Sequence, residues 1–391
     1  MYVTIKALEH YDMSRERGFL CRFDASAVGL KGVLAEARDI ALRLPQILPS
    51  GSVRAYLREN LPVVELADID GLTDPQARLA MVHYSFMVQS YVWGEPDAPT
   101  VLPRCLALPM VALADRLGQQ PLLPYSGYVL DNWGRLDDNG PIDLSNIYML
   151  QNFLGGQDEN WFVLVHVAIE ARAGAALALM KPICEAVEAE DQGRVETLLS
   201  EMKLVWHDLK TIFDRMPERC DPYVYFERVR PYIHGWKDNP ALPHGIIYEG
   251  VERFGTQAQA FRGQTGSQSS IVPSMDALLG IGHAADPLRA FLDQLHIYRP
   301  PSHRQFIDDV RETSKLRAFV QEAGHKGLTG AYNANVQAVA DFRSRHLEYA
   351  ASYINKQQKA AAGNDTDVGT GGTPFMKYLK KHRDETEANL L

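Results

Sequence analysis

Hydrophobic positions recur at steps of three and four residues through most of the chain, and strict alternation of apolar and polar residues is rare. A helical repeat puts apolar side chains on one face of a helix, whereas alternation is typical of a half-buried strand. The pattern therefore predicts an all-α fold. The segments with the clearest helical repeat are residues 32–45, 74–94, 162–180, 185–216, 286–298 and 331–355.

Breaks in this pattern indicate how the chain is organised. Between Gly94 and Pro141 many prolines, glycines and aspartates surround short apolar pieces, which is typical of a domain junction. We therefore expect a small, mainly helical N-terminal domain over residues 1–150 and a large helical domain over residues 151–391. Residues 356–373 are polar, rich in glycine and aperiodic, which predicts a mobile loop before a short final helix.

Composition narrows the classes of partner. Of the 391 residues, 46 % are hydrophobic and 23 % charged, which is ordinary for a globular protein with a sizeable core. The net charge of -9 argues against nucleic acid and against an anionic membrane surface. The start of the chain has no cationic stretch followed by an apolar one, and we expect no apolar run of the about 20 residues that a bilayer requires. These features predict a cytoplasmic protein without nucleic-acid or membrane partners.

The cysteines are far apart in the sequence and form no C-x-x-C pair, which predicts free thiols. This spacing argues against zinc held by cysteine, and histidine is the ligand type to consider for a metal. The cysteines are Cys21, Cys105, Cys184 and Cys220.

One histidine lies on an apolar helical stripe near the C-terminus. Val339, Phe342, His346 and Ala350 recur at helical spacing, so His346 should face a core, with Arg343 one turn before it. An imidazole and a guanidinium on neighbouring turns suit an iron-porphyrin, the first on the iron and the second on a propionate. Burial keeps the imidazole neutral, as a metal requires. The alternative is a core histidine bonded to a backbone carbonyl, with an arginine that reaches for solvent.

A second histidine, His166, lies within the apolar run FVLVHVAIEA at residues 162–171. Burying an imidazole without a partner costs on the order of 1–3 kcal/mol, so something must offset that cost. One explanation is a bond to Glu170, four residues later on the same face. The other is a role as a ligand to a cofactor.

An aromatic and an arginine follow a helix start at Asp221-Pro222, where aspartate is a good N-cap and proline suits the first helical position. Phe226 and Arg230 are one turn apart, and Tyr223 is expected on the same face. An aromatic wall beside a fixed guanidinium suits an aromatic amino acid, because arginine binds carboxylates bidentately. The alternative is the edge of an aromatic core with a surface arginine.

Two loops offer backbone N–H groups and hydroxyls without bulk, at residues 262–270 and 368–373. Either is suited to close over a ligand, although a plain glycine-rich linker explains them equally. The single E-x-x-H at Glu322 and His325 is not a di-iron motif, which needs two. The sequence has no H-E-x-x-H and no G-x-S-x-G, so zinc-protease and serine-hydrolase functions lose support.

Taken together, these segments resemble the indoleamine 2,3-dioxygenase family of haem enzymes. The resemblance runs in order from about Leu102 to the C-terminus, and the preceding residues match weakly. The strings that carry it are LPRCLALPMVALADRLG, PYSGYVLDNW, RPYIHGWKDNP, IYEG, SQSS with DALLGI, YRPPSHRQF, FRSRHL and GTGGTPFMKYL.

The resemblance implies an all-α fold in which a small N-terminal domain covers a large domain that contains haem b. It implies that His346 is the proximal iron ligand, that Arg343 lies near a propionate, that Asp276 belongs to the proximal polar network and that Gly266 lies beside the haem. It further implies a substrate pocket in which Arg230 binds the carboxylate, Phe226 contacts the indole, Phe162, Tyr125 and Tyr128 complete the distal side, and Thr370 belongs to a capping loop.

His166 departs from the best-known members of the family that this chain resembles, because those members have a small hydroxyl residue at this position. With a histidine at this position the chain resembles the related tryptophan 2,3-dioxygenases, in which a distal histidine meets the indole N–H. Here it either accepts that N–H or donates to oxygen. Tyr128 and Tyr225 stand where smaller or apolar residues are usual, which suggests a narrower and more polar pocket.

The resulting hypothesis is a haem dioxygenase that cleaves the indole C2–C3 bond of L-tryptophan to give N-formylkynurenine. It uses O2 as co-substrate and needs a reductant for ferric haem. One alternative is an oxygenase for a modified indole in secondary metabolism. The others are a haem-based sensor without catalysis and a helical interaction protein without a cofactor.

Overall fold

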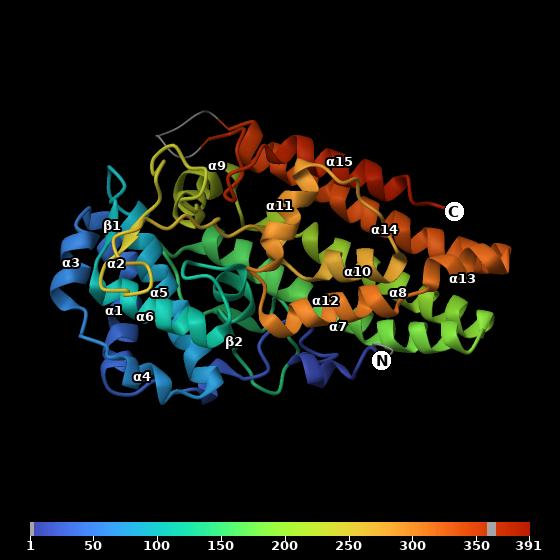
Figure 1. The fold of residues 1–391 in the computed structure, drawn as a ribbon, viewed down its shortest axis with the longest axis horizontal. Coiled ribbons are helices and arrows are strands. Elements are labelled where there is room, and N and C mark those ends of the chain that lie inside the picture. Colours follow the sequence, from blue (N-terminus) through green and yellow to red (C-terminus); the bar gives the residue numbers. More distant parts are fainter. Residues whose placement is uncertain (1–3, 358–364) are drawn as a thin grey trace.

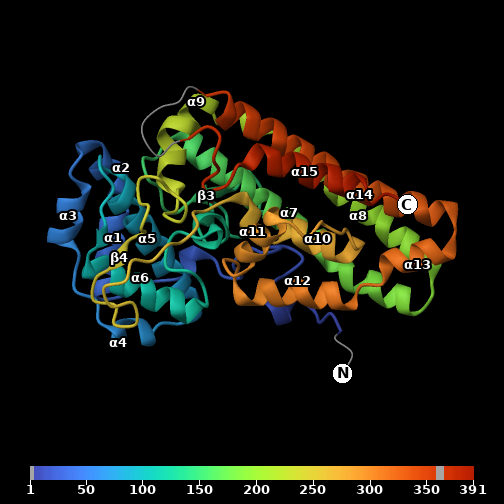
Figure 2. The ribbon, with the colours of Figure 1, turned by 45° about the horizontal axis from the view of Figure 1, so that its top comes forward.

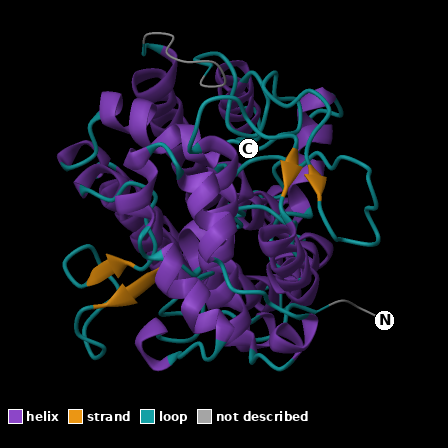
Figure 3. Ribbon diagram, turned by 90° about the vertical axis from the view of Figure 1, so that its left-hand side faces the viewer, coloured by secondary structure: helices purple, strands orange, loops and turns teal. Residues whose placement is uncertain are grey.

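The all-α prediction is confirmed. The computed structural model describes residues 4–357 and 365–391, and most of them are helical. Figure 3 shows the helices with two small pairs of strands at the edges. The strands pair as β1 (Val101–Leu102) with β4 (Ile247–Tyr248), in parallel, and β2 (Trp133–Arg135) with β3 (Ile147–Met149), antiparallel.

The first group of helices surrounds α5 (Asp74–Trp93), which is buried on nearly all sides and lies at the left in Figure 1. Thr73 caps it, because its hydroxyl accepts the Gln76 N–H while the Gln76 side chain accepts the Thr73 N–H. Of its neighbours, α1, α3 and α6 pack on α5 directly. The group comprises α1 (Val33–Ala41), α2 (Leu44–Ile47), α3 (Val53–Asn60), α4 (Leu66–Asp70) and α6 (Arg104–Leu117).

Long helices make up the rest of the molecule. α7 (Gln157–Glu188) packs along α8 (Gln192–Phe213), α8 along α14 (Lys326–Ala350), and α14 along α15 (Phe375–Glu387). These helices lie side by side in Figures 1 and 2. The shorter helices that complete this part are α9 (Pro222–Val224), α10 (Ile271–Leu279), α11 (Pro287–His296), α12 (Pro301–Thr313) and α13 (Leu316–Ala323).

Two details differ from the sequence pattern. Residues 185–216 hold the end of α7 and all of α8, because the chain breaks its helix before Asp191, whose carboxylate caps α8. The proline-rich stretch 94–141 contains α6, which keeps its helical form around Pro109 because it packs on α5. Residues 358–364 of the predicted loop 356–373 lie outside the described residues. The domain boundary near residue 150 stays a prediction.

α7 is more apolar than the sequence analysis assumed. With 32 residues and a mean hydropathy of 1.7 over its most apolar window, it is long and apolar enough to span a bilayer. The expectation that no such run exists was therefore wrong. However, 78 % of that window is buried within the protein, so its apolar character is explained by packing in the core.

Candidate functional site

A cavity of about 580 Å³ lies between α7, α10, α11, α14 and α15. Sites for small molecules and cofactors have volumes of about 300–1,000 Å³, so this cavity is in the right range. It brings together six of the residues singled out in the sequence, although they come from four separate parts of the chain. These residues are Tyr125, His166, Gly266, Asp276, Arg343 and His346.

His346 lies on α14 and faces the cavity from a stripe whose Val339 and Ala350 are buried. Burial, and then the neighbouring His166, lower the pKa of His346 to about 4. The imidazole is therefore neutral at physiological pH. It makes no hydrogen bond to any residue that the structure describes, so the alternative of a core histidine satisfied by a carbonyl has no support.

Arg343 lies one turn before His346 and is buried, not directed to solvent as the alternative had it. Its Nη2 donates to Oδ2 of Asp276 at 2.6 Å, and its Nη1 donates to the hydroxyl of Thr386. Burial alone would raise the pKa of Asp276, but the charge of Arg343 and the bond from His283 hold it at about 2. Asp276 is thus an anion that fixes the arginine at the edge of the cavity.

The remaining walls fit a porphyrin. Apolar side chains supply most of the lining that is not charged, including Ile169, Phe213, Ile271 and Phe342. Gly266 lines the cavity at a point where an added Cβ would meet nothing within 4 Å, so the space beside it is open. A neutral imidazole, apolar walls and an arginine at the rim are what a haem requires.

His166 lies on α7, lines the same cavity, and bonds to the Phe162 carbonyl through Nδ1 at 2.7 Å. A carbonyl only accepts, so Nδ1 carries the proton and Nε2 is left as an acceptor. Burial lowers the pKa of His166 and favours this neutral form. The suggested bond to Glu170 was wrong: the helix's own carbonyl, four residues earlier, offsets the burial of the ring.

Glu170 is instead the centre of a buried polar group. Its Oε1 accepts the hydroxyls of Tyr125 at 2.9 Å and Ser269 at 2.7 Å. Burial raises the pKa of Glu170 to about 7, against the effect of these two bonds. Tyr125 therefore lines the cavity with its hydroxyl turned to Glu170, and this bond joins the residue to α7.

Of the predicted substrate residues, Tyr125 lines the cavity, whereas Phe162 and Tyr128 belong to an aromatic cluster beside it. Phe162 connects the two, because its ring lies 4.8 Å from that of His166 and 4.5 Å from that of Tyr225. Tyr128 contacts the other side of Phe162 at 6.4 Å, and its hydroxyl is buried without a hydrogen bond to a described residue. The described side chains thus pack a dense aromatic wall next to His166.

Arg230 is fully buried, and its guanidinium lies 5.4 Å from the ring centroid of Phe226, which confirms that the two share a face. Tyr223 does not join them, since it is 65 % exposed. The reason is local: the chain passes from α9 into a π-helical turn, Tyr225–Val229, which shifts the angular spacing. This change brings Tyr225, buried, to the inner side instead.

Thr370 is held against the loop at residues 262–270. Its hydroxyl donates to the Gln264 carbonyl at 2.5 Å, and its own carbonyl accepts the Gly235 N–H at 3.3 Å. This approach requires glycine, because a Cβ on Gly263 would lie 2.2 Å from Gly235 N and 2.5 Å from Thr370 O. The two loops therefore do meet, on the side of Arg230, whose Nη2 donates to the Val368 carbonyl at 2.6 Å.

Several polar residues that line the cavity were not predicted from the sequence. Arg299 is buried and donates to the carbonyls of Ser267 and Ser269, which holds the loop beside Gly266. His283 and His382 also line it. Arg299 lies within the string YRPPSHRQF, one of those that carry the family resemblance, which is the signal that could have indicated it.

Comparison with known proteins gives one family over almost the entire chain. The family model described as Indoleamine 2,3-dioxygenase matches residues 7–389, so the resemblance begins far earlier than Leu102. Indoleamine 2,3-dioxygenase 1 of Rattus norvegicus is 35 % identical over 99 % of this chain and 96 % of its own length. Indoleamine 2,3-dioxygenase 2 of Homo sapiens is 32 % identical over 98 % and 96 %. A protein named Myoglobin, from Haliotis madaka, is 28 % identical over 97 % and 98 %.

Proposed function

Because the chain belongs to the indoleamine 2,3-dioxygenase family, we propose that it cleaves the C2–C3 bond of L-tryptophan to give N-formylkynurenine. The family makes it a haem dioxygenase that acts on indoles. Tryptophan and O2 combine in this reaction, and both oxygen atoms enter the product, so no net electrons are consumed. A reductant is needed only to bring ferric haem, which we take to be haem b, to the ferrous state.

His346 is the residue that would hold the iron. The observation that carries the proposal is its neutral imidazole, which has no hydrogen bond to a described residue and faces a cavity of suitable size. Arg343, fixed by Asp276, would pair with a propionate. When bound, the haem supplies the ferrous iron that activates O2. The chain's own residues then bind the cofactor, exclude water and orient the indole.

His166 is suited to orient the indole. Its Nδ1–H is committed to the Phe162 carbonyl, so Nε2 can accept the indole N–H and cannot donate to oxygen. Replacing His166 by alanine should lower kcat/KM for tryptophan roughly 5- to 150-fold, the equivalent of leaving one polar group unpaired at 1–3 kcal/mol.

1-Methyltryptophan is the matched control for that variant, because it lacks the N–H. Its kcat/KM should be nearly the same in the wild type and in His166→Ala, and the variant should keep its haem. Equal losses for both substrates, or loss of the haem itself, would contradict the orienting role.

Arg230 would bind the carboxylate of the substrate and Phe226 would contact its indole, as the buried guanidinium and the neighbouring aromatic ring suggest. Burial lowers the pKa of Arg230 to about 10, so the group remains charged at neutral pH and can pair with a carboxylate.

The deciding experiment is an absorption spectrum of the reduced protein with tryptophan and air, followed by product analysis. A Soret band together with N-formylkynurenine is expected. In His346→Ala the Soret spectrum should change and the product should be lost. If that variant kept the pigment and its coordination spectrum, the haem assignment to His346 would be wrong.

A second candidate function is reversible oxygen binding without turnover. The relative named Myoglobin supports it, since it covers almost the same length as the family enzymes. A stable oxygenated spectrum and unconsumed tryptophan would favour this function.

A panel of indoles tests substrate choice, because the buried Tyr128 and Tyr225 suggest a narrow pocket. Turnover of a modified indole without turnover of tryptophan would replace the proposed substrate.

A further inference from the structure

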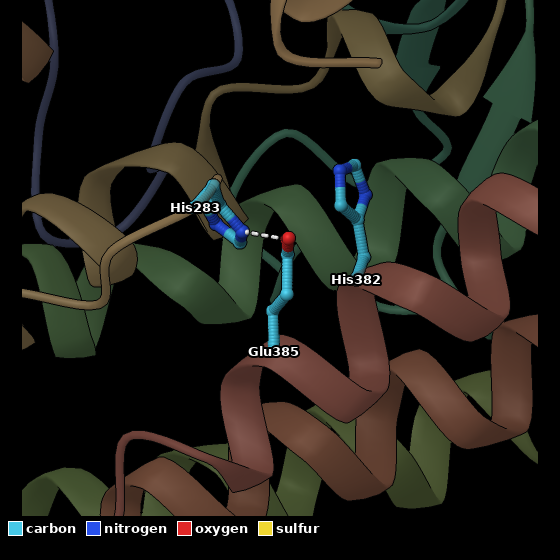
Figure 4. Close-up of side chains that lie close together, drawn as sticks. All are labelled: His283, His382 and Glu385. Atoms are coloured by element: carbon cyan, nitrogen blue, oxygen red, sulfur yellow. Dashed lines mark hydrogen bonds and ion pairs between the residues drawn. The ribbon is translucent and has the colours of Figure 1, made fainter. Parts of the chain in front are cut away.

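Two histidines and a glutamate meet at the edge of the cavity. His382 and Glu385 are three residues apart on α15, so they share one face of that helix, and His283 reaches them from the segment after α10 (Figure 4). Each side chain offers one nitrogen or oxygen donor, and these atoms lie within 4.8 Å of one another. None of the three has a part in the proposed reaction.

The hydrogen bonds around the cluster are those of an imidazole held between two carboxylates. Nδ1 of His283 lies 2.7 Å from Oε2 of Glu385, drawn as the dashed line in Figure 4. Its Nε2 lies 3.2 Å from Oδ2 of Asp276. His382 differs, because its Nε2 is buried and has no hydrogen-bond partner among the described residues. A buried nitrogen left unbonded destabilises the folded protein, and a ligand on this nitrogen would remove that cost.

We propose that His283, His382 and Glu385 bind a divalent transition-metal ion, with zinc as the best match, at a site separate from His346. Two imidazoles and one carboxylate are a common ligand set for zinc with a fourth position open to water. Asp276 takes the role of an outer carboxylate that orients His283 through its second nitrogen. The ion replaces the proton between His283 and Glu385, and that proton is released to solvent.

The charges around the cluster permit a cation. Three carboxylates, Asp276, Asp286 and Glu385, face two cationic side chains there. Arg343 is paired with Asp276, and Lys381 is in contact with Asp286 and lies 3.4 Å from Glu385. When the two imidazoles are neutral, the three carboxylates outnumber the two cationic side chains, so the net charge around the cluster is negative and attracts a divalent cation.

The test uses haem-loaded protein without an affinity tag, treated with EDTA and then dialysed against zinc chloride. Elemental analysis should find one zinc per chain, and calorimetry gives its affinity. X-ray absorption at the zinc edge should show two imidazole ligands, and the haem iron does not contribute to that signal. Because the loss of an outer-shell partner already costs 10- to 100-fold, His382→Ala and Glu385→Gln should each weaken binding by at least about 100-fold.

His325→Ala is the matched control. His325 lies 3.6 Å from Glu196 on the surface, so it is also a histidine beside a glutamate, but no third ligand from the described part of the chain joins them. Its removal should leave zinc affinity unchanged. Circular dichroism and the Soret band show whether each variant is folded.

Zinc that does not bind, or that binds equally well to His382→Ala and Glu385→Gln, would overturn the proposal and leave an ion-paired network only. The outcome does not depend on catalysis. A protein that failed to turn over tryptophan could still bind zinc here, and an active dioxygenase could lack this site.

Discussion

Replacing Glu170 by glutamine should stabilise the protein, and increasingly so as the pH rises. The carboxyl group of Glu170 is 1 % exposed, and its pKa is raised by burial to about 7, from an ordinary value of 4.5. Below pH 4.5 the group is protonated in both the folded and the unfolded chain, and it costs nothing. As the pH rises towards 7, the unfolded chain loses its proton first, so folding is progressively disfavoured.

The size of the effect follows from the two pKa values. At 1.36 kcal/mol for each tenfold change in the proton equilibrium, the difference between 4.5 and about 7 corresponds to about 3 kcal/mol above pH 7. Glutamine is neutral at every pH, and its amide oxygen can still accept the hydroxyls of Tyr125 and Ser269. The variant should therefore lie within about 1 kcal/mol of the wild type at pH 5 and exceed its free energy of unfolding by up to about 3 kcal/mol at pH 8.

Urea unfolding followed by far-ultraviolet circular dichroism, at pH 5 and at pH 8, measures this difference. Tyr125→Phe is the contrasting variant: it removes a donor to the carboxylate, so it should lose more stability at pH 8 than at pH 5. The reasoning fails if the advantage of Glu170→Gln is the same at both pH values, because the carboxyl would then titrate as it does in the unfolded chain.

Three other variants test the site. Arg230→Gln should lower kcat/KM for tryptophan roughly 10- to 100-fold, because a charge-assisted hydrogen bond to the carboxylate is lost. Turnover of tryptamine, which has no carboxylate, should be unchanged. A similar loss for tryptamine would argue against the assignment of Arg230 to the carboxylate. Asp276→Asn leaves the Arg343 charge unpaired, so in haem-free protein it should lower the free energy of unfolding, measured in urea, by roughly 3–5 kcal/mol. The loss should be smaller in haem-loaded protein, where a propionate would pair with Arg343. An equal loss in both forms would argue against a role of Arg343 in haem binding. Gly263→Ala should lower the melting temperature, because its Cβ would lie 2.5 Å from the Thr370 carbonyl; an unchanged Tm would mean that the loops separate without cost.

Much of the fold could be predicted from periodicity alone, because long helices such as α5, α7 and α14 carry apolar residues at helical spacing over many turns. The failures have local causes. α6 was hidden by Pro109 and its neighbours, and only packing on α5 keeps it helical. Tyr223 was placed on the wrong face because nothing in the sequence marks the start of a π-helical turn.

The site was predictable in part for a similar reason. His346 and Arg343 share one helix, so spacing alone relates them, and the structure confirms that both reach the cavity. The meeting of His166 with these residues depends on how α7 packs near α14, and only the family resemblance implied it. The cluster of His283, His382 and Glu385 joins two distant segments, which no sequence period records.

The bond from Arg230 to the Val368 carbonyl has a consequence for how substrate preference should be understood. Without a substrate, the chain's own C-terminal segment already engages the guanidinium that we propose for the amino-acid carboxylate. Affinity then measures an exchange of one oxygen for another, not the full strength of a new ion pair. Two indoles with identical carboxylates can therefore differ in affinity simply because one forces this segment to shift and the other does not.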